Sequence, residues 1–289
     1  MPEALLRALE IKIGQRMEGL LAGDYRSALF GAGTELAQVR PYVPGDDVRR
    51  IEWNVTARTG EPHVRVELAE RVLVTWLVLD TSPSMQFGTA DRRKADVAEG
   101  VAIAIGHVAT RRGNRLGIVT FGGSDPRSLP ARQGRMGLVG LLGALRQEPD
   151  EEARLGATEL GAAINRAGAL ARQRSLVVLV SDFRGPRDWR RPLLELAGRH
   201  DVVAIEIRDQ REQELTNVGA LWLVDPETGQ LLRVDTRSRR LRERFAAAAA
   251  EERAEVARLL ASAGVRHHVL STSGDWLRSL ATFLRRKRT

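Results

Sequence analysis

Short apolar runs alternate with amphipathic helical segments from residue 72 onward, and this alternation constrains the fold more than any other feature of the chain. The apolar runs are VLVTWLVLD, RLGIVTF, SLVVLVSD and DVVAIEI, at residues 72–80, 115–121, 175–182 and 201–207. Strands that are apolar on both faces and alternate with helices indicate a mostly parallel sheet covered on both sides. We therefore expect an α/β fold with a doubly wound, mostly parallel sheet and helices on both faces.

Helical spacing of apolar residues fills the intervals between these runs. The predicted helices are residues 91–112, 135–146, 158–173, 189–198, 238–262 and 274–287. Residues 220–235 form a predicted hairpin around an Asp-Pro-Glu-Thr-Gly turn, and VRHHVLST at 265–272 is the last predicted strand.

The first 71 residues follow a different pattern. Apolar residues at three-to-four spacing predict a helix over residues 4–21, and residues 24–71 have short runs without a helical period. Pro44-Gly45 is typical of a type II turn, and the alternation of Val64, Val66 and Leu68 with charges predicts a half-exposed strand. We predict an N-terminal segment, residues 1–71, with a short helix and a β-rich part, followed by the α/β domain, residues 72–289.

Composition narrows the class of protein. The 289 residues include no cysteine, which excludes disulfides and zinc–thiolate sites. The apolar stretches are far shorter than the roughly 20 residues that a membrane helix needs, so we expect no membrane span and a cytoplasmic protein. The net charge of +8 comes mainly from scattered arginines, and only 4% of residues are aromatic. We therefore expect no nucleic-acid binding; the open alternative, binding through arginine, predicts a steep salt dependence.

Two acids end two of the predicted strands. Asp80 ends the first and Asp182 ends the third, and ligands of doubly wound sheets bind beyond the carboxyl ends of the strands. Ser82 and Ser84 follow Asp80, and Thr158 opens a predicted helix facing the same edge. Carboxylate and hydroxyl oxygens suit Mg²⁺, and also Mn²⁺ or Ca²⁺. The alternative is structural, because Asp and Ser are favoured in helix N-caps and turns.

The segment DTSPS, residues 80–84, resembles the D-x-S-x-S pattern of the metal-ion-dependent adhesion site in von Willebrand factor A domains. GATEL at 156–160 and VSDF at 180–183 resemble the later threonine and aspartate loops of that family. The resemblance implies a von Willebrand factor A-like fold and a metal held by five residues, which are Asp80, Ser82, Ser84, Thr158 and Asp182. Since hydroxyls are neutral, such a site would keep an open position for an Asp or Glu of a partner protein.

Residues 31–60 are similar to the signature of bacterial domain-of-unknown-function 58 proteins. The matched residues are Arg40, Tyr42, Pro44, Gly45, Asp46, Asp47, Arg49, Ile51, Trp53, Ala57, Arg58 and Gly60. This resemblance implies partnership with a MoxR-type AAA+ ATPase. The role of the PGDD segment stays open between an acidic surface turn, an interface and an inter-element clasp held by Arg49 or Arg50.

Catalysis is the remaining alternative. The chain has no P-loop and no G-x-S-x-G motif, and position 82 carries serine where an aspartyl phosphotransferase needs a second aspartate. A metal-dependent hydrolase of phosphate esters using the same acids stays open. We predict a non-enzymatic, metal-dependent protein-binding module that works with the ATPase in the assembly or maturation of protein complexes.

Overall fold

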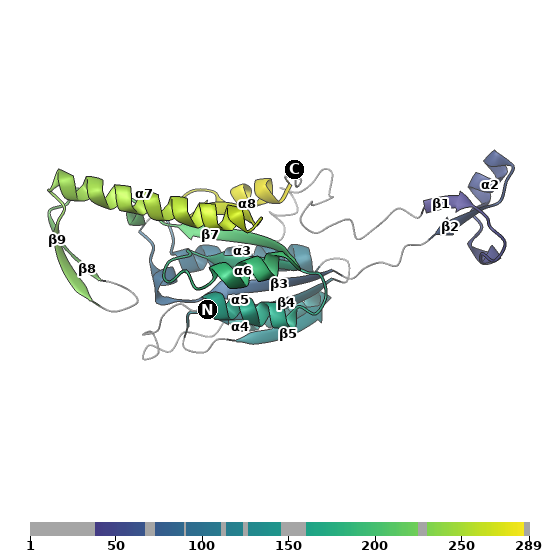
Figure 1. Cartoon of the computed structure of the whole chain (residues 1–289), viewed down its shortest axis with the longest axis horizontal. Helices are drawn as coiled ribbons and strands as arrows, with labels where there is room; N and C mark the ends of the chain where they lie inside the picture. Colours follow the sequence, from purple (N-terminus) through teal and green to yellow (C-terminus); the bar gives the residue numbers. More distant parts are fainter. Residues whose placement is uncertain are drawn as a thin grey trace.

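A computed structural model gives the structure of the chain and describes residues 38–66, 73–89, 91–110, 114–123, 127–145, 160–224 and 230–285. Its central sheet has six strands in the order β10-β7-β6-β3-β4-β5. Four of them, β7, β3, β4 and β5, are labelled in Figure 1. These strands are β3 (Val74–Asp80), β4 (Arg115–Phe121), β5 (Ser128–Gln133), β6 (Leu176–Ser181), β7 (Asp201–Arg208) and β10 (Arg266–Ser271). Every neighbouring pair is parallel except β4 and β5, which are antiparallel.

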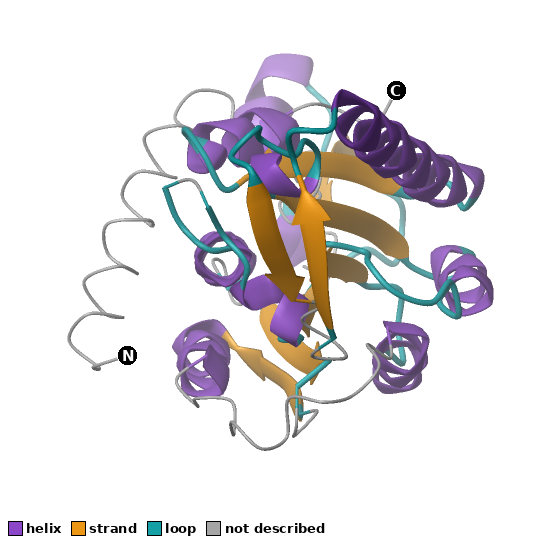
Figure 2. Ribbon diagram, turned by 90° about the vertical axis from the view of Figure 1, so that its left-hand side faces the viewer, coloured by secondary structure: helices purple, strands orange, loops and turns teal. Residues whose placement is uncertain are grey.

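Helices cover both faces of this sheet, as Figure 2 shows. The helices α3 (Lys94–Ala109), α4 (Gly134–Leu145) and α8 (Trp276–Arg285) contribute buried residues to the core on one face. The other face is covered by α5 (Leu160–Leu170), α6 (Arg190–Ala197) and α7 (Arg239–Ser262). The predicted doubly wound, mostly parallel sheet with helices on both faces is therefore confirmed.

The central strand β3 explains why its sequence reads as a continuous apolar run. Leu77 and Leu79 belong to one core, whereas Trp76 and Val78 belong to the other, and all four side chains are buried. Burial of each such side chain contributes about 1.5–3 kcal/mol, so both faces of the strand must be apolar. The charged residue Asp80 comes only where the strand leaves the two cores.

The N-terminal part that the structure describes is a small antiparallel unit. Its elements are β1 (Gln38–Pro41), the 3₁₀ helix η1 (Val48–Arg50), α2 (Trp53–Thr59) and β2 (His63–Val66). Strands β1 and β2 pair antiparallel, and Ile51 makes an isolated bridge to Val64. The predicted helix at residues 4–21 and position 68 of the predicted strand lie outside the described residues, and the division at residue 71 stays a prediction.

Of the three roles left open for the PGDD turn, the structure shows a clasp, made by Arg40. The guanidinium of Arg40 donates to both carboxylate oxygens of Asp46, at 2.6 and 2.8 Å. Asp47 instead accepts from the backbone N–H of Arg49 and caps η1. Gly45 has φ of +109°, as the second central position of a type II turn requires. The clasp therefore joins β1 to the turn, and its arginine is Arg40 and not Arg49 or Arg50.

Two short elements were missed in the sequence. Helix α2 has no buried residue, so no apolar period marks it. Strand β5 lies at the edge of the sheet and contains Pro130, and edge strands tolerate proline although central strands do not. The remaining elements are η2 (Pro83–Gln86), η5 (Gln210–Glu212) and the antiparallel strands β8 (Ala220–Val224) and β9 (Leu231–Asp235). In the part of the chain that the structure describes, we find no helix with the length and apolar character to cross a membrane.

Candidate functional site

The parallel pairing of β3 with β6 brings the two predicted acids to the same edge of the sheet. Leu79 lies opposite Val180 in the register, so Asp80 and Ser181 come next on neighbouring strands, followed by Asp182. The hydroxyl of Ser181 donates to Asp80 Oδ2 at 2.5 Å. The carboxylates of Asp80 and Asp182 are both buried, with residue exposures of 4% and 6%. The sheet register therefore places the two acids together at its carboxyl edge.

The loop after β3 folds back onto Asp80. The N–H of Ser82 donates to Asp80 Oδ1 at 2.9 Å, and Pro83 then starts η2. The hydroxyls of Ser82 and Ser84 lie 3.1 Å apart, and Ser84 Oγ donates to Asp182 Oδ2 at 2.8 Å. Four of the five predicted site residues are thus linked in one buried polar cluster. The fifth, Thr158, lies outside the described residues.

Gly122, which follows β4, is a component of the site that the sequence analysis missed. Its φ is +76°, and a Cβ at this position would lie 2.7 Å from Ser82 Cβ and 3.1 Å from Asp80 Oδ1. Any side chain here would therefore strain the backbone and push into the loop. Glycine at position 122 lets the loop that carries Ser82 and Ser84, the serine loop, lie against the end of β4.

Lys94 is the second component that was missed, and it carries the main electrostatic interaction of the site. Its side chain is fully buried, and its Nζ donates to Asp182 Oδ2 and to Glu212 Oε1, both at 2.6 Å. Arg184 adds a longer ion pair to Glu212, at 3.8 Å. The composition could have drawn attention to Lys94, because only three of the 45 basic residues are lysines and the rest are arginines. A compact ammonium fits a closed carboxylate pair where a planar guanidinium does not.

The two acids differ in electrostatic environment. Burial and the nearby charge of Asp182 raise the pKa of Asp80 to about 7, although hydrogen bonds from Ser181 and Ser82 act to lower it. Burial also raises the pKa of Asp182, but the charge and hydrogen bond of Lys94 outweigh it, so this pKa lies below its ordinary value. Within the described residues Asp80 has hydroxyl and N–H donors but no cation against it. Asp80 is therefore the acid of the site that has no counter-charge among the described residues, and it is partly protonated near neutral pH.

Backbone strain occurs directly beside these acids. Phe183 has φ of +55°, which makes it the one non-glycine residue with positive φ in the part of the chain described. Its N–H donates to Ser181 Oγ, and its ring packs edge-on against Trp189 with centroids 5.8 Å apart. A left-handed conformation costs about 1–2 kcal/mol outside glycine, and such strain gathers at functional sites. The strained turn holds Asp182 between Ser84 and Lys94.

The donor set suits a hard divalent cation. Carboxylate and hydroxyl oxygens from two segments converge, and Asp80 lacks a counter-charge within the described residues. A group of three or more His, Cys, Asp or Glu side chains able to hold a metal is not found among the described residues, so a site here depends on the serine hydroxyls. Lys94 already neutralises Asp182, so a cation bound here would compete with its ammonium.

Comparisons with solved structures give distant similarities. BatB from Bacteroides thetaiotaomicron aligns with 73% of this chain and 97% of its own, at 14% identity and a TM-score of 0.45. An aerotolerance-related membrane protein from Bacteroides fragilis aligns with 73% of this chain and 98% of its own, at 15% identity and a TM-score of 0.47.

Sequence comparisons are closer. The proteins Rv1480 of Mycobacterium tuberculosis and Mb1516 of Mycobacterium bovis are each 42% identical to this chain over 285 residues, covering 99% of it and 89% of the relative. The model of the family described as "Protein of unknown function DUF58" matches residues 38–255. The predicted family is confirmed: this chain belongs to the DUF58 family.

Proposed function

We propose that this protein is a non-enzymatic, metal-dependent protein-binding module. Its site is the polar cluster at the carboxyl edge of the sheet, and its ligand is a carboxylate of a partner protein. The single observation that carries the proposal is the convergence of Asp80, Ser82, Ser84 and Asp182 from segments 98 residues apart in the sequence. We propose Thr158 as a fifth ligand from the sequence resemblance alone.

A divalent cation, Mg²⁺ or another such as Mn²⁺ or Ca²⁺, would supply an electrophilic position that accepts a carboxylate oxygen. The protein's own residues prepare that position. Asp80, with its raised pKa of about 7, would contribute its negative charge on losing its proton to a bound cation, and the hydroxyls of Ser82 and Ser84 would add neutral oxygens. Lys94, which is shared between Asp182 and Glu212, offsets part of the charge of Asp182, so Asp80 and Asp182 together would leave a bound dication under-neutralised. Attraction for one more anionic oxygen follows from this imbalance.

The partner that we propose is a MoxR-type AAA+ ATPase presenting Asp or Glu, acting with this protein in the assembly or maturation of protein complexes. The support is the family membership together with the similarity of residues 31–60 to the family signature. In the described part of that signature, Trp53 is 70% exposed and Val48 is 60% exposed. Large exposed apolar side chains are a common feature of protein-interaction surfaces, which fits a binding role.

The experiment is a pull-down from extract of the native cell with the full-length protein as bait. We expect an AAA+ ATPase, identified by mass spectrometry, to be retained in Mg²⁺ and lost in EDTA. Because EDTA also strips Mg²⁺ from nucleotide bound to the ATPase, the decisive arm is the Asp80→Ala protein in Mg²⁺, which should lose the ATPase. Asp201→Ala, at the opposite end of β7 on the exposed surface, should retain it.

Two results would overturn the proposal. Retention of the ATPase by Asp80→Ala in Mg²⁺ would mean that the polar cluster does not dock the partner. Turnover of p-nitrophenyl phosphate by the purified wild type with Mg²⁺ or Mn²⁺, abolished by Asp80→Ala, would instead identify a metal-dependent phosphate-ester hydrolase.

A further inference from the structure

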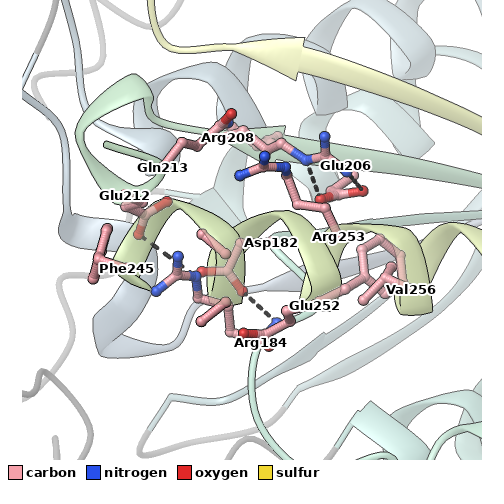
Figure 3. Close-up of a pocket in the computed structure, with 14 residues that line it drawn as sticks. Asp182, Arg184, Glu206, Arg208, Glu212, Gln213, Phe245, Glu252, Arg253 and Val256 are labelled. Carbon is pink, nitrogen blue, oxygen red and sulfur yellow. Dashed lines mark hydrogen bonds and ion pairs between the residues drawn. The ribbon is translucent and has the colours of Figure 1, made fainter. Parts of the chain in front are cut away.

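A cavity of about 190 Å³ lies beside the polar cluster of Asp80, Ser82, Ser84 and Asp182, between the ends of β6 and β7 and one face of α7. Figure 3 shows side chains from these segments turned toward one another around it. Its lining includes Asp182 of the candidate site and several half-exposed residues, among them Arg184 and Glu252, so the cavity reaches the surface. Pockets for drug-sized ligands are typically about 300–1,000 Å³. This one suits a small group or a single side chain.

Helix α7 leaves the space open because of its sequence. The lining residues on this helix follow three-to-four spacing, which puts them on one face. They are Phe245, Ala248, Ala249, Glu252, Arg253 and Val256. Val256 is buried and anchors the helix to the sheet, whereas Ala248 and Ala249 are too short to fill the gap. The cavity is therefore bounded by small side chains at its middle and by charged ones at its rim.

Each carboxylate in the lining already has a cationic partner. Asp182 and Glu212 share Lys94, and Glu212 also pairs with Arg184. Glu206 accepts hydrogen bonds from Arg208 and His267, and Glu252 accepts one from Arg187 at 3.1 Å. Lys94 and Arg187 lie outside the lining, and Arg187 also pairs with Glu255 at 3.8 Å, so five permanently charged cations face five carboxylates. The lining carboxylates are therefore already neutralised, and a further cation is not needed to balance them.

Arg253 differs from the other two arginines of the lining, Arg184 and Arg208, because it has no ion pair within the described part of the chain. Among the described residues its Nη1 is buried and has no hydrogen-bond partner. Figure 3 shows its side chain reaching from α7 beside Arg208 and Glu206 of β7. Buried polar atoms in folded proteins nearly always have a partner, and a buried guanidinium nitrogen without one is costly. An anionic oxygen in the cavity would satisfy it.

We propose that this cavity binds a carboxylate group, with Arg253 as its principal donor and Arg208 as the neighbouring cation. The planar donor fork of a guanidinium matches a carboxylate, and the cavity volume fits an acidic side chain or a small free acid. If the carboxylate comes from a protein, it belongs to a second acidic residue of the partner whose first acidic residue docks on the polar cluster. This part of the inference rests on the proposed function. Binding of the carboxylate itself does not need the metal.

The test uses the full-length protein in EDTA at constant ionic strength, with thermal unfolding and calorimetry as readouts. The probes are acetate, glutarate and N-acetylglutamate N-methylamide, with neutral acetamide as the uncharged isostere of acetate. We expect the carboxylates to raise the unfolding temperature and acetamide to leave it unchanged. Preference for the capped glutamate would assign the site to a protein side chain, and preference for glutarate to a free acid.

Arg253→Gln should weaken carboxylate binding at least tenfold, whereas Arg258→Gln, an exposed arginine on the same helix outside the cavity lining, should bind as the wild type does. Ala249→Leu fills the cavity without changing charge and should also weaken binding at least tenfold. Asp80→Ala should leave carboxylate binding in EDTA intact, so failure of the metal proposal and failure of this one are distinguishable. Equal effects of acetate and acetamide, or unchanged acetate binding by both Arg253→Gln and Ala249→Leu, would overturn the inference.

Discussion

The ammonium of Lys94 lies 2.6 Å from Asp182 Oδ2, the same oxygen that accepts the hydroxyl of Ser84 at 2.8 Å. One acid of the candidate metal site is thus neutralised from within, and the other, Asp80, is not. The second partner of Lys94, Glu212, lies 2.6 Å away and is nearly buried. Metal affinity at this site therefore depends on how the ammonium is shared between Asp182 and Glu212.

Replacing Lys94 should separate stability from metal binding. In Lys94→Met two buried carboxylates lose their counter-charge, and breaking such a pair typically costs 3–5 kcal/mol. We expect a loss of that size in the free energy of unfolding without metal, and a larger recovery on adding Mn²⁺ than in the wild type. Chemical denaturation with and without MnCl₂ measures both. Arg93→Met, an exposed neighbour, is the control, and an identical Mn²⁺ response of Lys94→Met and wild type would contradict this account.

Removing the charge of Glu212 should have the opposite effect on metal affinity. In Glu212→Gln the ammonium of Lys94 has one anionic partner left, so it binds Asp182 more strongly and competes better with a cation. We expect weaker Mn²⁺ binding by calorimetry, by several fold. Glu195→Gln, an exposed acid on α6, should match the wild type. Tighter Mn²⁺ binding by Glu212→Gln would refute the competition.

Gly122→Ala tests whether the serine loop needs the close approach of β4. Alanine here would place a Cβ 2.7 Å from Ser82 Cβ in a backbone with φ of +76°. Gly264→Ala is the matched control, since its φ is +68° with nothing within 4 Å of the added Cβ. We expect about 1 kcal/mol of destabilisation in the control from the backbone alone, and about 1–3 kcal/mol more, with weaker Mn²⁺ binding, in Gly122→Ala. Equal losses in the two variants would show that the contact has no role.

Sequence patterns predict the position of some of these residues but not of others. Asp80, Ser82 and Ser84 share one short motif, and Asp182 ends another apolar strand, so a parallel sheet predicts their meeting. Lys94 lies 88 residues from Asp182 and 118 from Glu212, in no motif, and its position follows from the packing of α3 and η5 over the sheet edge. Arg40 and Asp46 were likewise missed as a pair because several arginines flank that turn. Spacing along the chain predicts the strands, whereas the choice among many charged partners needs the packed structure.

Acid should destabilise the fold partly through Asp209. Burial raises the pKa of this carboxyl, but donors from Thr89, Thr272 and the N–H of Arg211 outweigh it and lower the pKa to about 2. A carboxyl with a depressed pKa stabilises the fold above its unfolded pKa of about 3.9, and this contribution is lost as the pH falls from about 4 to about 2. We expect Asp209→Asn to lose about 2 kcal/mol of unfolding free energy at pH 7 and to show a shallower acid dependence. Unfolding from pH 7 to 2 measures this, with the exposed Glu195→Gln as control; a full acid dependence in Asp209→Asn would contradict it.

Divalent-cation binding to the metal-free full-length protein tests the central claim most directly. Titration with Mn²⁺, followed by electron paramagnetic resonance and calorimetry, should give one Mn²⁺ per chain that Mg²⁺ displaces. Asp80→Asn and Ser84→Ala should lose this binding, and Asp201→Asn should keep it. A wild-type protein that binds no Mn²⁺, or an Asp80→Asn protein that binds it as well as the wild type, would contradict the account.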